Sequence, residues 1–138
     1  MKYLILLAIL ILPFNLRAGE EHGHGHSHGQ IQVPSTLPEV RAMIASKQSE
    51  LTALLAAGDA PGVHAATDEL VACVKAIPRL LPAADGTGIQ RVEGMANNAA
   101  KAWASVAHDG DHGDFAGAAR QADKAAATYR LLEGRLPK

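Results

Sequence analysis

The feature that most constrains this chain is that its apolar residues recur every three or four positions along four separate segments. Residues on one face of an α-helix repeat with this spacing, whereas a strand alternates at every second residue. Apolar residues make up 48% of the sequence although only 4% is aromatic, because alanine, the strongest helix former, supplies much of the difference. β-branched residues are sparse. The pattern therefore predicts an all-α fold and argues strongly against an all-β fold. The sequence also has no strand-like runs from which a βαβ fold could be built.

Caps and breakers set the limits of the first two helices. The stretch Thr36–Glu39 reads T-L-P-E, a T-x-x-E capping box with Pro38 in the first turn that begins the first helix, and Gly58 ends the helix. The second helix is expected to open at Asp59. Pro78 lies inside its apolar pattern, so we expect a kink or a broken last turn there.

The other two helices are marked in the same way. A second capping box, Thr87–Gln90, is expected to begin the third helix, and Gly110 is expected to stop it. Asp114 caps the fourth helix. Short connections make successive helices antiparallel neighbours, so residues 35–138 are predicted to form an up-down-up-down four-helix bundle, a single domain.

Each predicted helix has an apolar face that would supply the core. In chain order the four faces are Leu37, Val40, Ile44, Leu51, Leu54 and Leu55; Val63, Thr67, Leu70, Val74, Ile77 and Leu81; Ile89, Val92, Ala96, Ala99, Trp103 and Val106; and Phe115, Ala119, Ala122, Ala126, Tyr129, Leu132 and Leu136.

Residues 1–18 are predicted to be a signal peptide rather than part of the fold. Lys2 is followed by an apolar run from Leu4 to Leu12, which is too short to span a bilayer, and Ala18 offers a small residue for cleavage. An uncleaved membrane anchor is the alternative. Export predicts a periplasmic or secreted protein, with no stable membrane anchor once the segment is removed.

Residues 19–34 have no apolar periodicity and are predicted to be a disordered, histidine-rich tail. Four of the seven histidines lie here, at His22, His24, His26 and His28, separated by small residues. Imidazole suits Zn, Cu, Ni and Co, and small spacers let several rings meet one ion. The tail is therefore predicted to bind a divalent transition metal, with Zn or Cu favoured; the alternative is a solvated polar tail.

The remaining histidines are predicted to share one end of the bundle. His64 lies in the first turn of the second helix, His108 closes the third, and His112 lies in the following loop. In an up-down-up-down bundle the first and third connections lie at the same end. With Asp68 or Asp111 completing it, this end is a candidate second metal site.

That second site has simpler alternatives. Asp59 and Asp114 can be explained as helix N-caps. His108 can be explained by its place at a helix C-terminus, where the macrodipole favours a positively charged side chain. The tail leaves from the opposite end, at the start of the first helix. We expect it to approach the second site without joining it.

Several functional classes are disfavoured by the sequence. A formal net charge of −1 argues against a nucleic-acid partner. One cysteine, Cys73, excludes a disulfide framework, a CxxC site and c-type haem, and we expect it to be buried. Met43 and Met95 read as core residues, and the last helix has no histidine to bind b-type haem. No Ser-His-Asp order, phosphate loop or HExxH motif is present, so we expect no enzyme.

The export signal, the run H-G-H-G-H-S-H-G at residues 22–29 and the alanine-rich four-helix unit together resemble the small His-rich periplasmic metal-binding proteins. Some of these accompany heavy-metal efflux systems. The resemblance implies sequestration or delivery of a divalent metal ion, with an efflux system as the protein partner. The alternative is a periplasmic adaptor or interaction module whose histidine tail is incidental.

Overall fold

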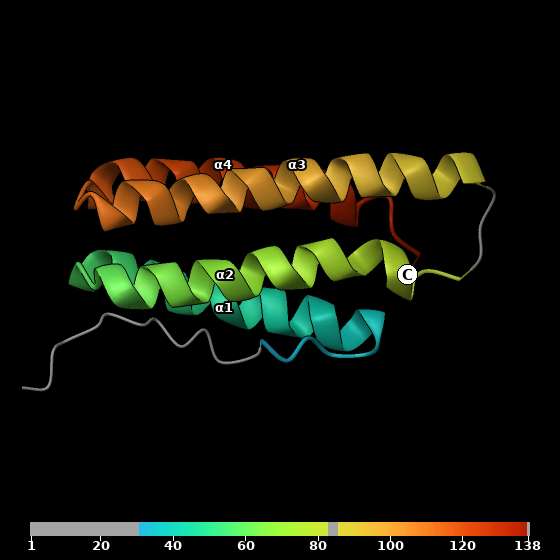
Figure 1. The fold of residues 1–138 in the computed structure, drawn as a ribbon, viewed down its shortest axis with the longest axis horizontal. Coiled ribbons are helices and arrows are strands. Elements are labelled where there is room, and N and C mark those ends of the chain that lie inside the picture. Colours follow the sequence, from blue (N-terminus) through green and yellow to red (C-terminus); the bar gives the residue numbers. More distant parts are fainter. Residues whose placement is uncertain (1–30, 83–85, 138) are drawn as a thin grey trace, which may run out of the picture.

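The computed structural model of the protein describes residues 31–82 and 86–137. Within these ranges the chain is helical and contains no strand, as the sequence predicts (Figure 1). The elements are α1 (Leu37–Ala57), α2 (Ala60–Ala76), the short 3₁₀ helix η1 (Ile77–Leu80), α3 (Gly86–Asp111) and α4 (Phe115–Glu133).

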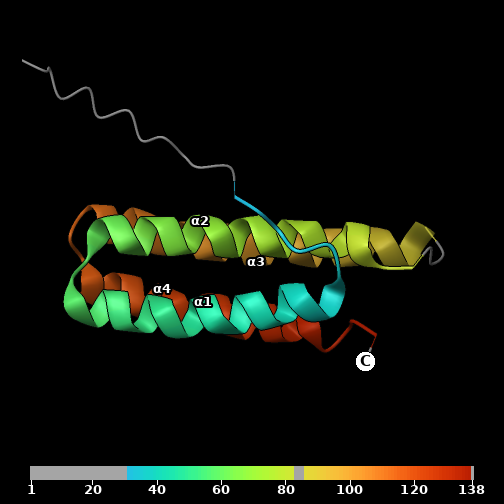
Figure 2. The same cartoon turned by 90° about the horizontal axis from the view of Figure 1, so that it is seen from below.

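The four helices form an antiparallel bundle in which α1 and α2 make one layer and α3 and α4 the other (Figures 1 and 2). Each helix packs on the next one in the sequence, and α1 and α4 close the ring with a smaller contact. The connections at residues 58–59 and 112–114 lie at the same end. A Cβ added to Gly58 would lie 3.5 Å from Cε2 of Phe115 across this end. We call it the loop end.

Aspartate caps open two of the helices as predicted. The Gly62 N–H donates to Oδ1 of Asp59 at 3.1 Å, and the Gly117 N–H donates to Oδ1 of Asp114 at 2.7 Å. These bonds satisfy backbone donors that an isolated first turn leaves unpaired. Both residues are therefore explained by their structural role at the loop end.

The structure does not confirm the side-chain bonds of either predicted capping box. α1 starts after Thr36, but the Thr36 side chain makes no cap bond to the backbone. Its hydroxyl instead donates to Oε2 of Glu39 at 2.7 Å, so the side-chain pairing of this box was predicted wrongly. α3 begins at Gly86, directly after the undescribed residues 83–85, so the role of Thr87 stays a prediction.

Pro78 has the predicted effect on the second helix. α2 ends at Ala76, and the chain continues as η1 from Ile77 to Leu80. Proline lacks the N–H that would continue the α-helical ladder and its ring crowds the preceding turn. The second helix is therefore a 17-residue α-helix followed by a four-residue 3₁₀ helix.

Gly110 does not stop α3, which corrects the sequence prediction. The helix continues to Asp111, and the glycine is buried against α2. A Cβ at Gly110 would lie only 2.8 Å from Cγ1 of Val63. The residue that reverses the chain is Gly113, with φ of 76°. Gly110 thus allows a close approach of two helices.

The bundle interior matches the predicted faces of the first three helices closely. Most of their positions are buried, including Trp103, whereas Leu37, Leu54, Leu81 and Ile89 are half-buried. The face of α4 was partly wrong. Ala119 is exposed, and Ala118 and Ala125 are buried instead. In a stretch dominated by alanine the hydrophobic pattern does not distinguish neighbouring positions, so the register of this face is decided by packing.

Cys73 is fully buried, and Met43 and Met95 are half-buried against the core, as predicted. Tyr129 is also in the core. Over the described ranges, no helix combines the length and the apolar character needed to cross a membrane.

The segment before α1 folds back over the bundle. From the start of α1, residues 31–36 run across the outside of the α1–α2 layer towards the α2 side (Figure 2). Val33 is half-buried and packs against the core. The chain therefore leaves the described part of the structure beside α2 and not beyond the end of the bundle.

Candidate metal centre

The predicted ligands divide into two groups by location. His22, His24, His26 and His28 lie outside the described residues. His64, His108, Asp111 and His112 lie towards the loop end, as the predicted connectivity requires, and Asp68 lies one turn further along α2, at the middle of that helix.

The first turns of α2 set the position of His64. Asp59 caps the helix, and His64 and Asp68 follow on one face, four residues apart. Nε2 of His64 lies 3.5 Å from Oδ2 of Asp68. The side chains are 41% and 37% exposed, so the pair is open to solvent and to an entering ion.

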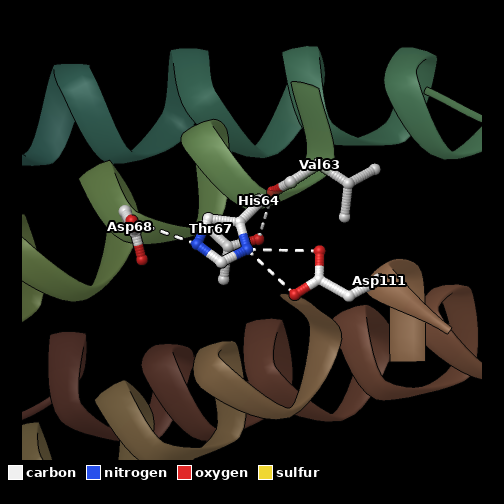
Figure 3. Close-up of polar contacts among 5 residues, drawn as sticks. All are labelled: Val63, His64, Thr67, Asp68 and Asp111. Carbon is white, nitrogen blue, oxygen red and sulfur yellow. Dashed lines mark hydrogen bonds and ion pairs between the residues drawn. The ribbon is translucent and has the colours of Figure 1, made fainter. Parts of the chain in front are cut away.

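Asp111 reaches His64 because α3 passes through Gly110 without stopping. The Val63–Gly110 contact brings the two helices close, and the next residue on each, His64 and Asp111, then meet. Nδ1 of His64 lies 3.0 Å from Oδ2 and 3.2 Å from Oδ1 of Asp111 (Figure 3). The contact joins residues 47 positions apart in the sequence.

The backbone below the ring is fixed by a buried hydroxyl. Thr67 is fully buried and its Oγ1 donates to the carbonyl oxygen of Val63 at 2.6 Å (Figure 3). This bond satisfies a polar group that would otherwise be costly to bury. The turn that carries His64 is therefore held from inside the bundle as well as by its cap.

The two sides of the His64 ring have different geometry. The Asp111 contact has hydrogen-bond length, with Nδ1–H as the donor, whereas the 3.5 Å to Asp68 is longer than the usual range. Two ligands bonded at about 2.0–2.2 Å to one tetrahedral ion are about 3.4 Å apart. Nε2 and the Asp68 oxygen thus have the separation of two ligands on one ion.

Asp111 lies on the Nδ1 side of the His64 ring. Histidines that bind metals commonly donate their other ring N–H to a carboxylate, which fixes the tautomer and orients the ring. A charged imidazolium between two carboxylates would be the other state compatible with these contacts. As an ion pair between half-exposed side chains, that state stabilises the fold by only about 0–1 kcal/mol.

His108 and His112 form a second pair. The His112 N–H donates to the carbonyl oxygen of His108 at 3.3 Å, so the helical spacing extends past the end of α3. Both side chains are exposed, and their ring centroids are 4.7 Å apart with planes inclined at 74°. This distance and angle are those of an edge-to-face contact between two rings.

The five predicted residues do not converge on one point. Across residues 31–82 and 86–137, no group of three or more His, Cys, Asp or Glu side chains is arranged to hold a metal ion. The structure gives instead the His64–Asp68 pair, with Asp111 behind the ring, and the separate His108–His112 pair.

Sequence reasoning missed an ion-pair network between α1 and α2. Nζ of Lys47 lies 2.9 Å from Oε2 of Glu50 and 3.0 Å from Oε2 of Glu69. Hydrogen bonds to Glu50 and then Glu69 raise the pKa of Lys47. The spacing of Lys47 and Glu50 is visible in the sequence, but the pairing with Glu69 depends on how the helices dock. Because the Glu50 and Glu69 carboxylates are paired with the Lys47 ammonium, we do not consider them candidate metal ligands.

Cys73 is also an unsuitable ligand. Burial raises the pKa of its thiol, and the nearby Glu69 adds to the effect. A metal binds the thiolate, which this site disfavours.

The chain was compared with protein-family models, curated proteins and solved structures, and no match was found.

Proposed function

We propose that this protein binds a divalent transition metal ion, with Zn or Cu favoured, and sequesters or delivers it in metal homeostasis or resistance. The observation that carries the proposal is the setting of His64. One ring nitrogen is held by Asp111 at 3.0 Å, and the other lies 3.5 Å from an Asp68 oxygen, the separation of two ligands on one ion.

In this proposal the groups have distinct tasks. Nε2 of His64 and the Asp68 carboxylate are the ligands, and Asp111 positions the ring through Nδ1. His108 and His112 are a second chelating pair, and the tail histidines supply further imidazoles. No haem and no catalysis are involved.

In this proposal the location of the protein depends on residues 1–18, the predicted signal peptide. Export would put the protein in the periplasm or outside the cell, where it would take up metal ions and hand them to an efflux system. The net charge of −1 fits a metal-binding role better than a nucleic-acid one.

The alternative function is a helical interaction module with an incidental tail. A groove of about 310 Å³ between α1 and α4 favours it, lined by Thr52, Leu55, Ala56, Phe115, Ala119, Ala122 and Asp123. An interaction module would use this groove and would be indifferent to metal ions.

Metal-dependent stabilisation distinguishes the two functions. An ion that binds only the folded chain raises stability by about 2.7 kcal/mol when present at 100 times its Kd. For a bundle of this size we expect Zn to raise the unfolding temperature by about 10 °C. A Zn-dependent rise is the expected result in thermal unfolding followed by circular dichroism.

The matched variants are Asp68→Asn and Glu93→Gln. Asp68→Asn removes a charged ligand while the His64–Asp111 contact remains, and it should reduce the rise strongly. Glu93 is an exposed carboxylate in the first half of α3, remote from the loop end, so Glu93→Gln should leave the rise unchanged. A rise that Asp68→Asn does not alter would remove this pair from the function.

A further inference from the structure

The outer face of α4 carries a continuous stripe of exposed side chains. Arg120, Lys124, Ala127 and Leu131 follow one another at the spacing of one helix face, and all four are exposed. At 1.5 Å per residue these positions extend over about 16 Å. Arg135 is also exposed and follows one turn later, just past the end of the helix. We call these five residues the α4 stripe.

The positive charge of the α4 stripe is not neutralised within the bundle. Across residues 31–82 and 86–137, none of its three cations makes an ion pair. Arg130, at the edge of the stripe, is exposed and unpaired in the same way. Asp123 is the one exposed carboxylate of α4, because Glu133 is half-buried and its Oε1 lies 3.9 Å from Nε of Arg41. This face of the helix therefore presents a surplus of positive charge.

Leu131 adds an apolar contact to the same stripe. It is 69% exposed, and in the described part of the chain it is the only large apolar side chain left so open to solvent. A single exposed leucine needs no explanation by itself, but this one lies in line with the cations. Leucine beside basic side chains is typical of helices that bind at the interface of an anionic membrane, where the apolar group enters the acyl boundary.

The shape of this face favours a flat partner. The groove of about 310 Å³ lies between α1 and α4, and none of the stripe residues lines it. The stripe runs along the convex outside of a helix, so a plane of negative charge can contact all of its side chains at once. Charges that lie further from such a plane than the Debye length of about 8–10 Å contribute little. The net charge of −1 of the whole chain therefore does not oppose the contact.

We propose that the α4 stripe docks the protein reversibly on a membrane surface rich in anionic phospholipid. Its three cations contact the phosphate groups, and Leu131 enters the interface between them. The contact is peripheral and is distinct from the membrane anchor considered for residues 1–18. It does not depend on the proposed metal site, and it would keep an exported protein next to the membrane.

Vesicle binding tests the proposal with the full chain. Vesicles of phosphatidylcholine are compared with vesicles of an equal mixture of phosphatidylcholine and phosphatidylglycerol, and the bound protein is measured by sedimentation. Residues 1–18 are present in every sample, so the readout is the gain caused by the anionic lipid. We expect a gain of about tenfold or more, because each cation near an anionic surface adds to the affinity. The gain should be lost in about 0.5 M NaCl, which screens exposed charges.

Matched variants remove the same charge from two places. Arg120→Gln combined with Lys124→Gln takes two cations from the stripe and should weaken binding to the anionic vesicles about 30-fold. Arg91→Gln combined with Lys101→Gln takes two exposed cations from α3 and should leave this binding nearly unchanged. Leu131→Ala keeps every charge and should weaken binding about tenfold. All five side chains are exposed, so the circular dichroism of the variants should match that of the parent chain.

Three results would overturn the docking surface. Equal losses in the α3 and α4 variants would mean that net charge alone drives binding. Binding that shows no preference for anionic lipid would remove the role of the cations. Soluble polyglutamate that binds the stripe as tightly as the vesicles do would assign it an acidic protein partner instead of a membrane. The Zn-dependent rise in unfolding temperature should be the same in all these variants, so the proposed function stands or fails separately.

Discussion

Tyr129 places a phenol in the bundle interior, and the residues described around it provide no hydrogen-bond acceptor for the hydroxyl. Its side chain is 5% exposed. Burial, with a smaller contribution from Glu133, raises its pKa to about 12. Trp103 Nε1 is a buried donor of the same kind in this part of the chain. Such groups cost stability when unpaired, so the core is not optimised at these positions.

The Tyr129 pKa predicts loss of stability in alkali. Because the pKa of Tyr129 is higher in the folded chain than in the unfolded chain, the neutral phenol contributes its full share to the free energy of unfolding below pH 10. That contribution is lost as the pH rises from about 10 to about 12. Each pKa unit is worth about 1.4 kcal/mol, so the loss approaches roughly 3 kcal/mol. Tyr129→Phe should remove this part of the pH dependence and be neutral or stabilising at pH 7. Urea unfolding at pH 7 and pH 11 measures both effects, and an identical alkaline loss in the variant would contradict the assignment.

At the scale of single elements, α3 decides the geometry of the loop end. A glycine near the end of a helical pattern is usually a stop, but the missing side chain of Gly110 serves the approach to Val63. Continuation by one residue to Asp111 then creates the contact with His64.

Two glycines in α3 give a matched pair of substitutions. Gly110→Ala would put a Cβ 2.8 Å from Cγ1 of Val63, so we expect a loss of about 1–3 kcal/mol through overpacking. Gly94 is exposed and a Cβ there would meet nothing within 4 Å, so Gly94→Ala should stabilise by about 0.5–1 kcal/mol.

Chemical denaturation measures both changes, and the sign is the decisive readout. If both alanines stabilised the protein, Gly110 would not be a close-approach position. Gly110→Ala should also weaken the metal-dependent stabilisation, because displacing α3 moves Asp111 away from His64.

At the scale of the whole molecule, export is the property on which the proposed metal role depends. The apolar run of residues 4–12 and Ala18 predict that the exported chain begins near Gly19. Protein purified from the periplasmic fraction should therefore have the intact mass of a chain without residues 1–18. A membrane-bound form that retains them would show a tethered protein and would contradict the export prediction.

Much of the fold could be read from the sequence because helices are local structures. The periodic apolar residues, Asp59, Gly58 and Pro78 act within a turn or two of their own positions, so their effects do not depend on the rest of the chain. Short connections then leave few ways to arrange four helices. The antiparallel order, and with it the gathering of His64, His108 and His112 towards one end, follows from these local features.

The remaining features depend on how the helices dock. Alanine provides little contrast along α4, so packing selected Ala118 and Ala125 over Ala119. Gly110 became a contact because Val63 faces it. By itself the sequence determined the helices, their order and the end where polar residues gather, since these are set by neighbours along the chain. Only the tertiary structure decided that Asp111 holds His64 from 47 residues away, because that distance is set by the packing of α2 on α3.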